Sequence, residues 1–169
     1  KSLLFNFSFF FLQNEHSEKL LNQAGIENCM VTGDTRFDRV ADTAKSSISI
    51  PEMEAFKGKY SLFIAGSTWA EDEKVLIQYI NQSDNELKFV IAPHEIKEEN
   101  LKRIESQLLV ATIRFSKAKN EDIEHASVLI IDNIGMLSSL YQYGDIAYIG
   151  GAFGSNVHNV LEASVFGMP

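Results

Sequence analysis

YSLFIAGST, residues 60–68, is an apolar run that ends in a glycine and two hydroxyl residues. It leads directly into WAEDEKVLIQYIN, residues 69–81, which has the periodicity of an amphipathic helix. The apolar residues on its expected inner face are Val75, Leu76, Tyr79 and Ile80. A continuous apolar strand followed by such a helix is typical of a parallel sheet covered by helices. The two stretches therefore predict an α/β fold, with a strand over residues 60–65 and a helix over residues 69–81.

The same alternation of strand and helix continues on both sides of this unit. We expect further strands over residues 9–12, 28–32, 87–92, 111–115, 128–131 and 146–149. We expect further helices over residues 17–24, 36–46, 97–109, 136–143 and 159–166. Ser17 is the expected cap of the first helix, and Gly25 its stop. The polar stretch 46–51 is interpreted as a linker, with a domain boundary near residue 45. The fold class is thus a Rossmann-like parallel sheet with helices on both faces.

The composition narrows the class of function. With 45% apolar and 22% charged residues, the chain has the balance of a globular protein with a packed core. A net charge of −8 argues against binding to a nucleic-acid backbone, which requires clustered Lys and Arg. The apolar run 3–12 has about half the length that a transmembrane helix needs. Neither end of the 169 residues resembles a natural terminus, so we expect a fragment of a longer protein.

Polar and small residues follow several of the expected strands. In parallel α/β sheets, ligands bind at the carboxyl ends of the strands. The residues that follow the strands are Gly66-Ser67-Thr68, Pro93-His94, Asp132-Asn133 and Gly150-Gly151. These positions are therefore the candidates for a binding site.

Two of these candidates have structural alternatives. Gly66, Ser67 and Thr68 open a helix, where free N–H groups and hydroxyls suit a phosphate. A plain helix cap, with the acids of the first turn favoured by the helix dipole, explains the same residues. His94 can contact a ligand, but a lone histidine is also a common structural hydrogen-bonding residue. The sequence leaves both alternatives open.

The stretch 150–156, Gly-Gly-Ala-Phe-Gly-Ser-Asn, has three glycines, which allow close backbone approach and positive φ. His158, Asn159 and Glu162 follow at spacings of three and four, so they share one side of the helix start. Such a helix start can hold a phosphate, and a carboxylate one turn further can bind a ribose diol. The alternative is a tight loop with a capped helix and a solvated glutamate. The four histidines are far apart, and we expect no metal site.

Four motifs in order resemble the 3-deoxy-D-manno-octulosonic acid (Kdo) transferases of lipopolysaccharide synthesis. They cover nearly the whole chain. They are the segments 31–40, VTGDTRFDRV; 65–69, AGSTW; 131–137, IDNIGML, leading to Leu140-Tyr141; and 149–151, IGG, continued by 158–162, HNVLE.

The resemblance implies an inverting, metal-independent GT-B glycosyltransferase that moves Kdo from CMP-Kdo to a lipid A precursor without a further cofactor. Residues 1–45 would end the N-terminal acceptor-side domain, and residues 46–169 would be most of the donor-side domain, truncated at its C-terminus. The catalytic residue, a general base, and a membrane-associating segment would lie upstream, at the cytoplasmic face of the bacterial inner membrane. The isolated fragment would then be soluble and inactive.

The resemblance also assigns donor contacts. Ser67 and Thr68, after Gly66, would contact phosphate or sugar, and His94 would approach the donor. Gly150 and Gly151 would make room for it. His158 and Asn159 would orient the phosphate and the Kdo carboxylate, and Glu162 the ribose.

Two departures from the family pattern stand out. The family has Pro-Arg-His where this chain has Pro93-His94-Glu95, so a cationic contact is missing. Many members have Gly-Gly-His-Asn where this chain has residues 156–159, Asn-Val-His-Asn. Two other functions remain open: a GT-B enzyme for a UDP-sugar, transferase or epimerase, and a non-catalytic nucleotide-binding module.

Overall fold

The computed structural model describes residues 3–46, 48–83, 86–118, 123–154 and 159–169. The chain divides into two compact units, Lys1–Asp42 and Thr43–Pro169, called here the N-terminal and C-terminal units. Within the described residues, no helix combines the length and the apolar character needed to cross a membrane.

The N-terminal unit is built around a two-stranded parallel sheet. Strands β1 (Phe10–Leu12) and β2 (Cys29–Val31) pair in register and are joined by helix α1 (Glu15–Gln23). A short 3-10 helix (Leu4–Asn6) precedes them, and α2 (Thr35–Lys45) follows. The expected cap of α1 was wrong: Asn14, not Ser17, is the cap, because its Oδ1 accepts the Ser17 N–H at 3.0 Å.

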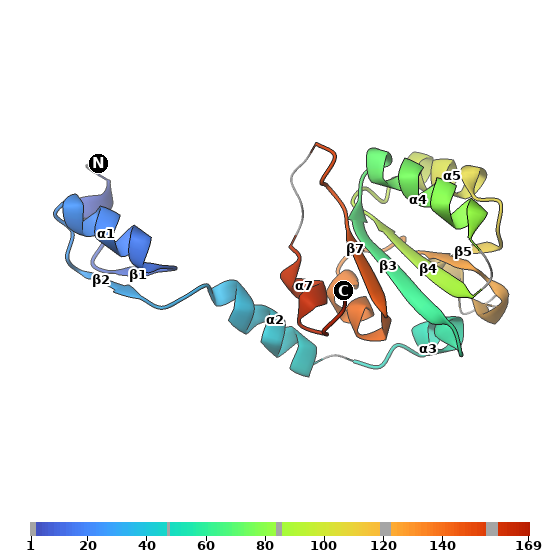
Figure 1. Ribbon diagram of the computed structural model, residues 1–169, viewed down its shortest axis with the longest axis horizontal. Coiled ribbons are helices and arrows are strands. Elements are labelled where there is room, and N and C mark those ends of the chain that lie inside the picture. Colours follow the sequence, from blue (N-terminus) through green and yellow to red (C-terminus); the bar gives the residue numbers. More distant parts are fainter. Residues whose placement is uncertain (1–2, 47, 84–85, 119–122, 155–158) are drawn as a thin grey trace. The chain divides into compact units, whose positions relative to one another are not determined.

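A five-stranded, fully parallel sheet forms the centre of the C-terminal unit (Figure 1). Its strands are β3 (Ser61–Thr68), β4 (Leu87–Pro93), β5 (Thr112–Arg114), β6 (Val128–Ile130) and β7 (Ile146–Ile149). They lie in the order β5-β6-β4-β3-β7. The chain moves from β3 to one side of the sheet and returns to the other side with β7. The strand order therefore reverses between β3 and β7, which is where ligands bind in open α/β sheets.

Helices cover both faces of this sheet, as expected from the sequence (Figure 1). Helices α4 (Ala70–Gln82) and α5 (Glu98–Gln107) pack on one face. The other face is covered by α3 (Pro51–Lys57), α6 (Leu137–Leu140), α7 (Leu161–Ser164) and three 3-10 helices (Phe115–Lys117, Ile123–His125 and Tyr141–Tyr143).

Helix α3 was not predicted, because residues 46–51 were interpreted as a linker ended by proline. Pro51 instead opens the helix, a position where its missing N–H costs nothing. Met53 and Phe56 are fully buried against the sheet. The ammonium of Lys88 on β4 is also buried there and donates to the carbonyls of Phe56 (2.7 Å) and Glu124 (2.6 Å). Its burial lowers the pKa of Lys88.

The inner face of α4 was only partly predicted. Leu76 and Ile80 are buried as expected, but Ile77 is buried where Val75 and Tyr79 are half exposed. The helix is rotated toward the side that carries the buried Glu73. Because the charged Glu73 lies on the inner face, the apolar residues alone did not indicate which face of the helix is buried.

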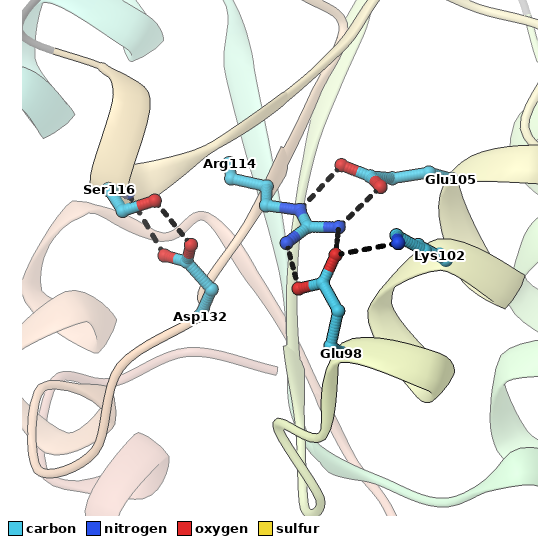
Figure 2. Close-up of polar contacts among 6 residues, drawn as sticks. All are labelled: Glu98, Lys102, Glu105, Arg114, Ser116 and Asp132. Atoms are coloured by element: carbon cyan, nitrogen blue, oxygen red, sulfur yellow. Dashed lines mark hydrogen bonds and ion pairs between the residues drawn. The ribbon is translucent and has the colours of Figure 1, made fainter.

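Arg114 holds helix α5 against the edge of the sheet (Figure 2). Its guanidinium donates to Glu105 Oε1 at 2.7 Å and to Glu98 Oε2 at 2.6 Å. The Arg114 contact is also the main cause that lowers the pKa of Glu98. Nearby, Asp132 accepts the Ser116 backbone N–H at 2.9 Å and its hydroxyl, which fixes the turn after β5 to the end of β6 (Figure 2).

Candidate functional site

A pocket of about 140 Å³ lies at the carboxyl ends of β3, β4 and β6. Ser67 and His94, two of the residues predicted from the sequence, line it together with Asn133. The remaining lining residues are Ala92, Pro93, Ile96, Ile131, Ile134, Gly135 and Leu137. The pocket can hold part of a ligand of nucleotide size, since whole-ligand sites are about 300–1,000 Å³.

Ser67 reaches the pocket because the strand bulges there. The pairing with β4 shifts between Gly66 and Thr68, and Ser67 has a φ of 54°. That left-handed conformation is unfavourable for a residue with a side chain and is held by the neighbouring strands. The Thr68 carbonyl accepts the His94 N–H at 2.8 Å, so the two strand ends are locked together.

Gly66 and Gly150 allow close packing within the protein. A Cβ on Gly66 would lie 2.0 Å from the Tyr141 hydroxyl, and one on Gly150 would lie 2.4 Å from the Ser67 carbonyl oxygen. The Gly150 N–H also donates to the Gly66 carbonyl at 2.9 Å. The two glycines thus bring the ends of β3 and β7 together at the point where the strand order reverses.

Thr68 has a structural partner. Its side chain is buried, and its hydroxyl donates to Glu73 Oε1 at 3.1 Å. The other carboxylate oxygen of the fully buried Glu73 pairs with Arg103. Burial raises the pKa of Glu73, while the contacts with Arg103 and Thr68 act in the opposite direction. The alternative of a helix cap at Ser67 or Thr68 was wrong, because Trp69 occupies the cap position of α4. Thr68 contacts Glu73 instead, and Ser67 lines the pocket.

The His94 side chain is exposed at the pocket and stacks on Trp69, with ring centroids 4.2 Å apart and planes inclined by 22°. Trp69 precedes α4, so the start of this helix orients the imidazole. The pocket lining contains no Lys or Arg among the residues that the structure describes. Nearby, Lys97 pairs with Glu95 and Arg103 pairs with Glu73. An anion in this pocket would therefore be bound by neutral donors and the imidazole.

Asn159 and Glu162 contact each other at the start of α7. The Asn159 side-chain amide donates to Glu162 Oε1 at 3.3 Å, and its oxygen accepts the Leu161 N–H at 3.1 Å. Burial raises the pKa of Tyr141, and the negative charge of Glu162 raises it further. The charge of Glu162 thus acts on the Tyr141 hydroxyl, which lies against Gly66. His158 lies outside the described residues.

The sequence analysis missed Asp72 and Tyr148. The Asp72 carboxylate is buried and accepts the Gly151 N–H and the Tyr148 hydroxyl across the strand ends. In the sequence, Asp72 is one of three consecutive acids at a helix start, and nothing distinguishes it from its neighbours. Among the described residues, no group of three or more His, Cys, Asp or Glu side chains is arranged to hold a metal ion.

No protein-family model matches the chain. Curated relatives cover most of it. A bifunctional glycosyltransferase/methyltransferase from Fusobacterium nucleatum is 24% identical over 96% of the chain and 26% of its own length. The Kdo transferase of Chlamydophila psittaci is 26% identical over 95% of the chain and 38% of its own length. That of Aquifex aeolicus is 30% identical over 69% of the chain and 33% of its own length.

The solved structure of the C-terminal CMP-Kdo binding domain of WaaA from Acinetobacter baumannii has the same fold. It aligns with a TM-score of 0.57 and 21% identity, over 79% of this chain and 67% of that one. The sequence resemblance is confirmed, since the chain is similar to Kdo transferases over most of its own length. It spans between a quarter and two-fifths of the length of the relatives named above.

Proposed function

We propose that the C-terminal unit is the donor-binding domain of a GT-B glycosyltransferase that uses CMP-Kdo. One observation carries the proposal: at the reversal of strand order Gly66 packs against Tyr141, and the charge of Glu162 acts on the Tyr141 hydroxyl. Ser67 and His94 line a pocket beside them. The names of the relatives, and the ligand after which the Acinetobacter domain is named, support CMP-Kdo as the donor.

The groups at this site suit the parts of CMP-Kdo. The Ser67 hydroxyl and the His94 imidazole would donate to the phosphate, and the Glu162 carboxylate would accept hydrogen bonds from the ribose hydroxyls. Because Asn159 donates to Glu162, its amide would hold that carboxylate in place. No Lys or Arg is among the described lining residues of the pocket, so we expect a weak dependence of affinity on salt.

The complete enzyme would transfer Kdo with inversion to a lipid A precursor, at the cytoplasmic face of the bacterial inner membrane. Inverting transfer needs a general base that deprotonates the acceptor hydroxyl. We assign no residue of this chain to that role. The proposed contribution of the C-terminal unit is to bind and orient the donor.

Glu162 provides the test. Glu162→Ala should weaken CMP binding to this chain by about 1.5–3 kcal/mol, the range for hydrogen bonds to a charged group. Glu162→Gln should lie between, since it keeps one acceptor and loses the charge. Calorimetric titration with CMP measures the affinity, and a melting curve shows whether the variant stays folded. Glu71→Ala, which removes an exposed carboxylate from the first turn of α4, is the matched control.

The same titration distinguishes the competing functions. Equal or tighter binding of UMP would favour an enzyme that uses a UDP-sugar. If the folded chain binds neither nucleotide at millimolar concentration, the assignment of this edge of the sheet as a nucleotide site is wrong.

A further inference from the structure

The carboxylate of Asp72 joins three parts of the C-terminal unit that are distant in sequence. Its Oδ2 accepts the Trp69 N–H at 2.9 Å and the Gly151 N–H at 3.0 Å. Its Oδ1 accepts the Tyr148 hydroxyl at 2.6 Å. The residue is only 1% exposed, so all three contacts form away from water.

These contacts exceed what a helix cap requires. A carboxylate at this position of a helix caps it by accepting the N–H of the residue before the helix, here Trp69. The other two donors come from β7 and the turn that follows it, more than 70 residues away. Burial raises the pKa of Tyr148, and the contact with Asp72 raises it further, so the phenol stays protonated as a donor.

The turn that Asp72 fixes packs against Ser67, which is a lining residue of the pocket. Gly151 has a φ of 100°, and its N–H is fixed by the carboxylate. The adjacent Gly150 packs so closely on Ser67 that a Cβ would meet its carbonyl oxygen at 2.4 Å. Ser67 lines the pocket. A displacement of Gly151 would therefore shift Gly150 and Ser67, and with Ser67 the lining of the pocket.

We propose that Asp72 is a positioning residue that sets the shape of the nucleotide site by fixing the glycine turn after β7. This inference rests on the proposed function for the ligand, but the contact itself can be tested without one. Asp72 touches no ligand in this proposal and acts only through Gly151 and Tyr148.

The Asp72→Ala variant removes all three acceptor contacts. We expect it to weaken CMP binding by about tenfold or more, because small misplacements of binding groups have large effects. Asp72→Asn has the same shape. Its amide oxygen can accept both N–H groups, and its amide nitrogen can donate to the Tyr148 oxygen, so affinity should fall less than about threefold. Tyr148→Phe loses one contact, and its CMP affinity should lie between those of Asp72→Asn and Asp72→Ala.

A lower CMP affinity caused by lower stability of the fold must be distinguished from one caused by displacement of the glycine turn. Ile104→Val creates a small cavity in the fully buried core under α5 and removes none of the three hydrogen bonds of Asp72. It should lower the melting temperature and leave CMP affinity unchanged. Hydrogen exchange of the backbone at Gly150 and Gly151, followed by mass spectrometry, should be faster in Asp72→Ala than in Ile104→Val.

The outcomes are distinct. Wild-type CMP affinity in a less stable Asp72→Ala would make Asp72 a plain helix cap and overturn the inference. A loss of CMP affinity in Asp72→Asn as large as in Asp72→Ala would also overturn it, since geometry would then not be the cause.

If the wild-type chain binds no CMP, the proposed function fails. Unchanged hydrogen exchange at Gly150 and Gly151 in Asp72→Ala would refute the Asp72 contact by itself. Should Asp72→Ala not fold, Asp72→Asn and Tyr148→Phe carry the same comparison.

Discussion

The two units place their apolar side chains differently. In the C-terminal unit, two clusters of buried side chains lie on the two faces of the sheet. In the described part of the N-terminal unit, only Ile26 and Val40 are buried hydrophobic residues. Phe11 and Met30 pair across β1 and β2; Phe11 is 71% exposed and Met30 is half exposed. Similar strands and helices thus form in both units, but among the described residues only the C-terminal unit has clusters of buried side chains on both faces of its sheet.

This difference shows that secondary structure and a core are separate requirements. A stretch of about 40 residues buries too little apolar surface to be stable by packing alone. The side-chain hydrogen bonds described in the N-terminal unit are short-range or exposed, such as the Asn14 cap and the Asn28 amide that donates to the Ser8 carbonyl at 2.6 Å. We therefore expect substitutions of the same kind to have unequal effects in the two units.

The largest effect should come from paired phenylalanine substitutions. Phe89→Ala empties a site that is 2% exposed and packed between Phe63 and Tyr79, at ring-centroid distances of 5.7 and 5.9 Å. It should lower the free energy of unfolding of the C-terminal unit by about 3–5 kcal/mol. Phe11→Ala removes a ring that is 71% exposed and should change stability by less than about 0.5 kcal/mol.

The single tryptophan allows the units to be followed separately. Trp69 is the only tryptophan and lies in the C-terminal unit, so its fluorescence reports unfolding there. Far-UV circular dichroism reports both units. A loss above about 2 kcal/mol in Phe11→Ala would mean that its ring is covered in solution, and the contrast between the units would be wrong.

A smaller effect is expected for arginine ion pairs. The Arg114 side chain is 11% exposed and joins β5 to two carboxylates of α5. Arg114→Met should lower the free energy of unfolding by about 1–2 kcal/mol. It removes the link between β5 and α5 and leaves Glu98 and Glu105 without their main partner. Lys102→Met removes only an exposed partner of Glu98 and should have no measurable effect. Arg36→Met should likewise have none, since Arg36 pairs with Asp34 two residues away.

Urea unfolding of the three variants, monitored by Trp69 fluorescence and circular dichroism, measures these differences. Equal decreases in the free energy of unfolding for Arg114→Met and Lys102→Met would show that burial of the arginine does not strengthen its ion pairs. Added salt should weaken the Arg114 effect only in part, because the arginine is largely buried while Glu98 is 59% and Glu105 31% exposed.

Local patterns in the sequence predicted the sheet and its covering helices, because apolar runs and helical periodicity extend over many residues. The α/β class is confirmed by the five parallel strands. The boundaries were less accurate: α7 is confined to Leu161–Ser164, inside the expected helix 159–166. Helix α3 was missed because Pro51 is compatible with both a linker and a helix start.

The candidate site was less predictable than the fold. Its location at the strand ends follows from topology, and Ser67 and His94 do line a pocket there. The contacts of Asp72 with Tyr148 and of Glu73 with Arg103 span at least 30 residues of sequence, which periodicity does not encode. The same holds for the packing of Gly66 on Tyr141. The assignment of Gly150, Gly151, Asn159 and Glu162 to a nucleotide remains a prediction.

The smallest effect concerns two aspartates whose pKa values are both lowered. The side-chain hydrogen bond to Arg36 lowers the pKa of Asp34 to about 2. The hydrogen bond to Lys57 lowers the pKa of Asp145, which also accepts the Leu62 N–H at 2.8 Å. Asp145 thus connects residues more than 80 positions apart, whereas Asp34 and Arg36 can meet in the unfolded chain as well. A pKa shift stabilises the fold only if it is absent from the unfolded state.

A carboxyl group whose folded pKa is lowered contributes stability above its unfolded pKa, and this contribution is lost as the pH falls through the folded value. Asp145→Asn should therefore lower the free energy of unfolding at pH 7, by less than about 1 kcal/mol because the side chain is 45% exposed. The difference from wild type should shrink as the pH falls below the ordinary aspartate pKa of about 4. Asp34→Asn should show no such dependence on pH. Urea titrations of the three proteins between neutral and acidic pH measure both trends. If Asp34→Asn lowered the free energy of unfolding as much as Asp145→Asn, with the same dependence on pH, the Asp34–Arg36 pair would be absent from the unfolded chain. The polar contacts of the N-terminal unit would then stabilise it more than its exposed surface indicates.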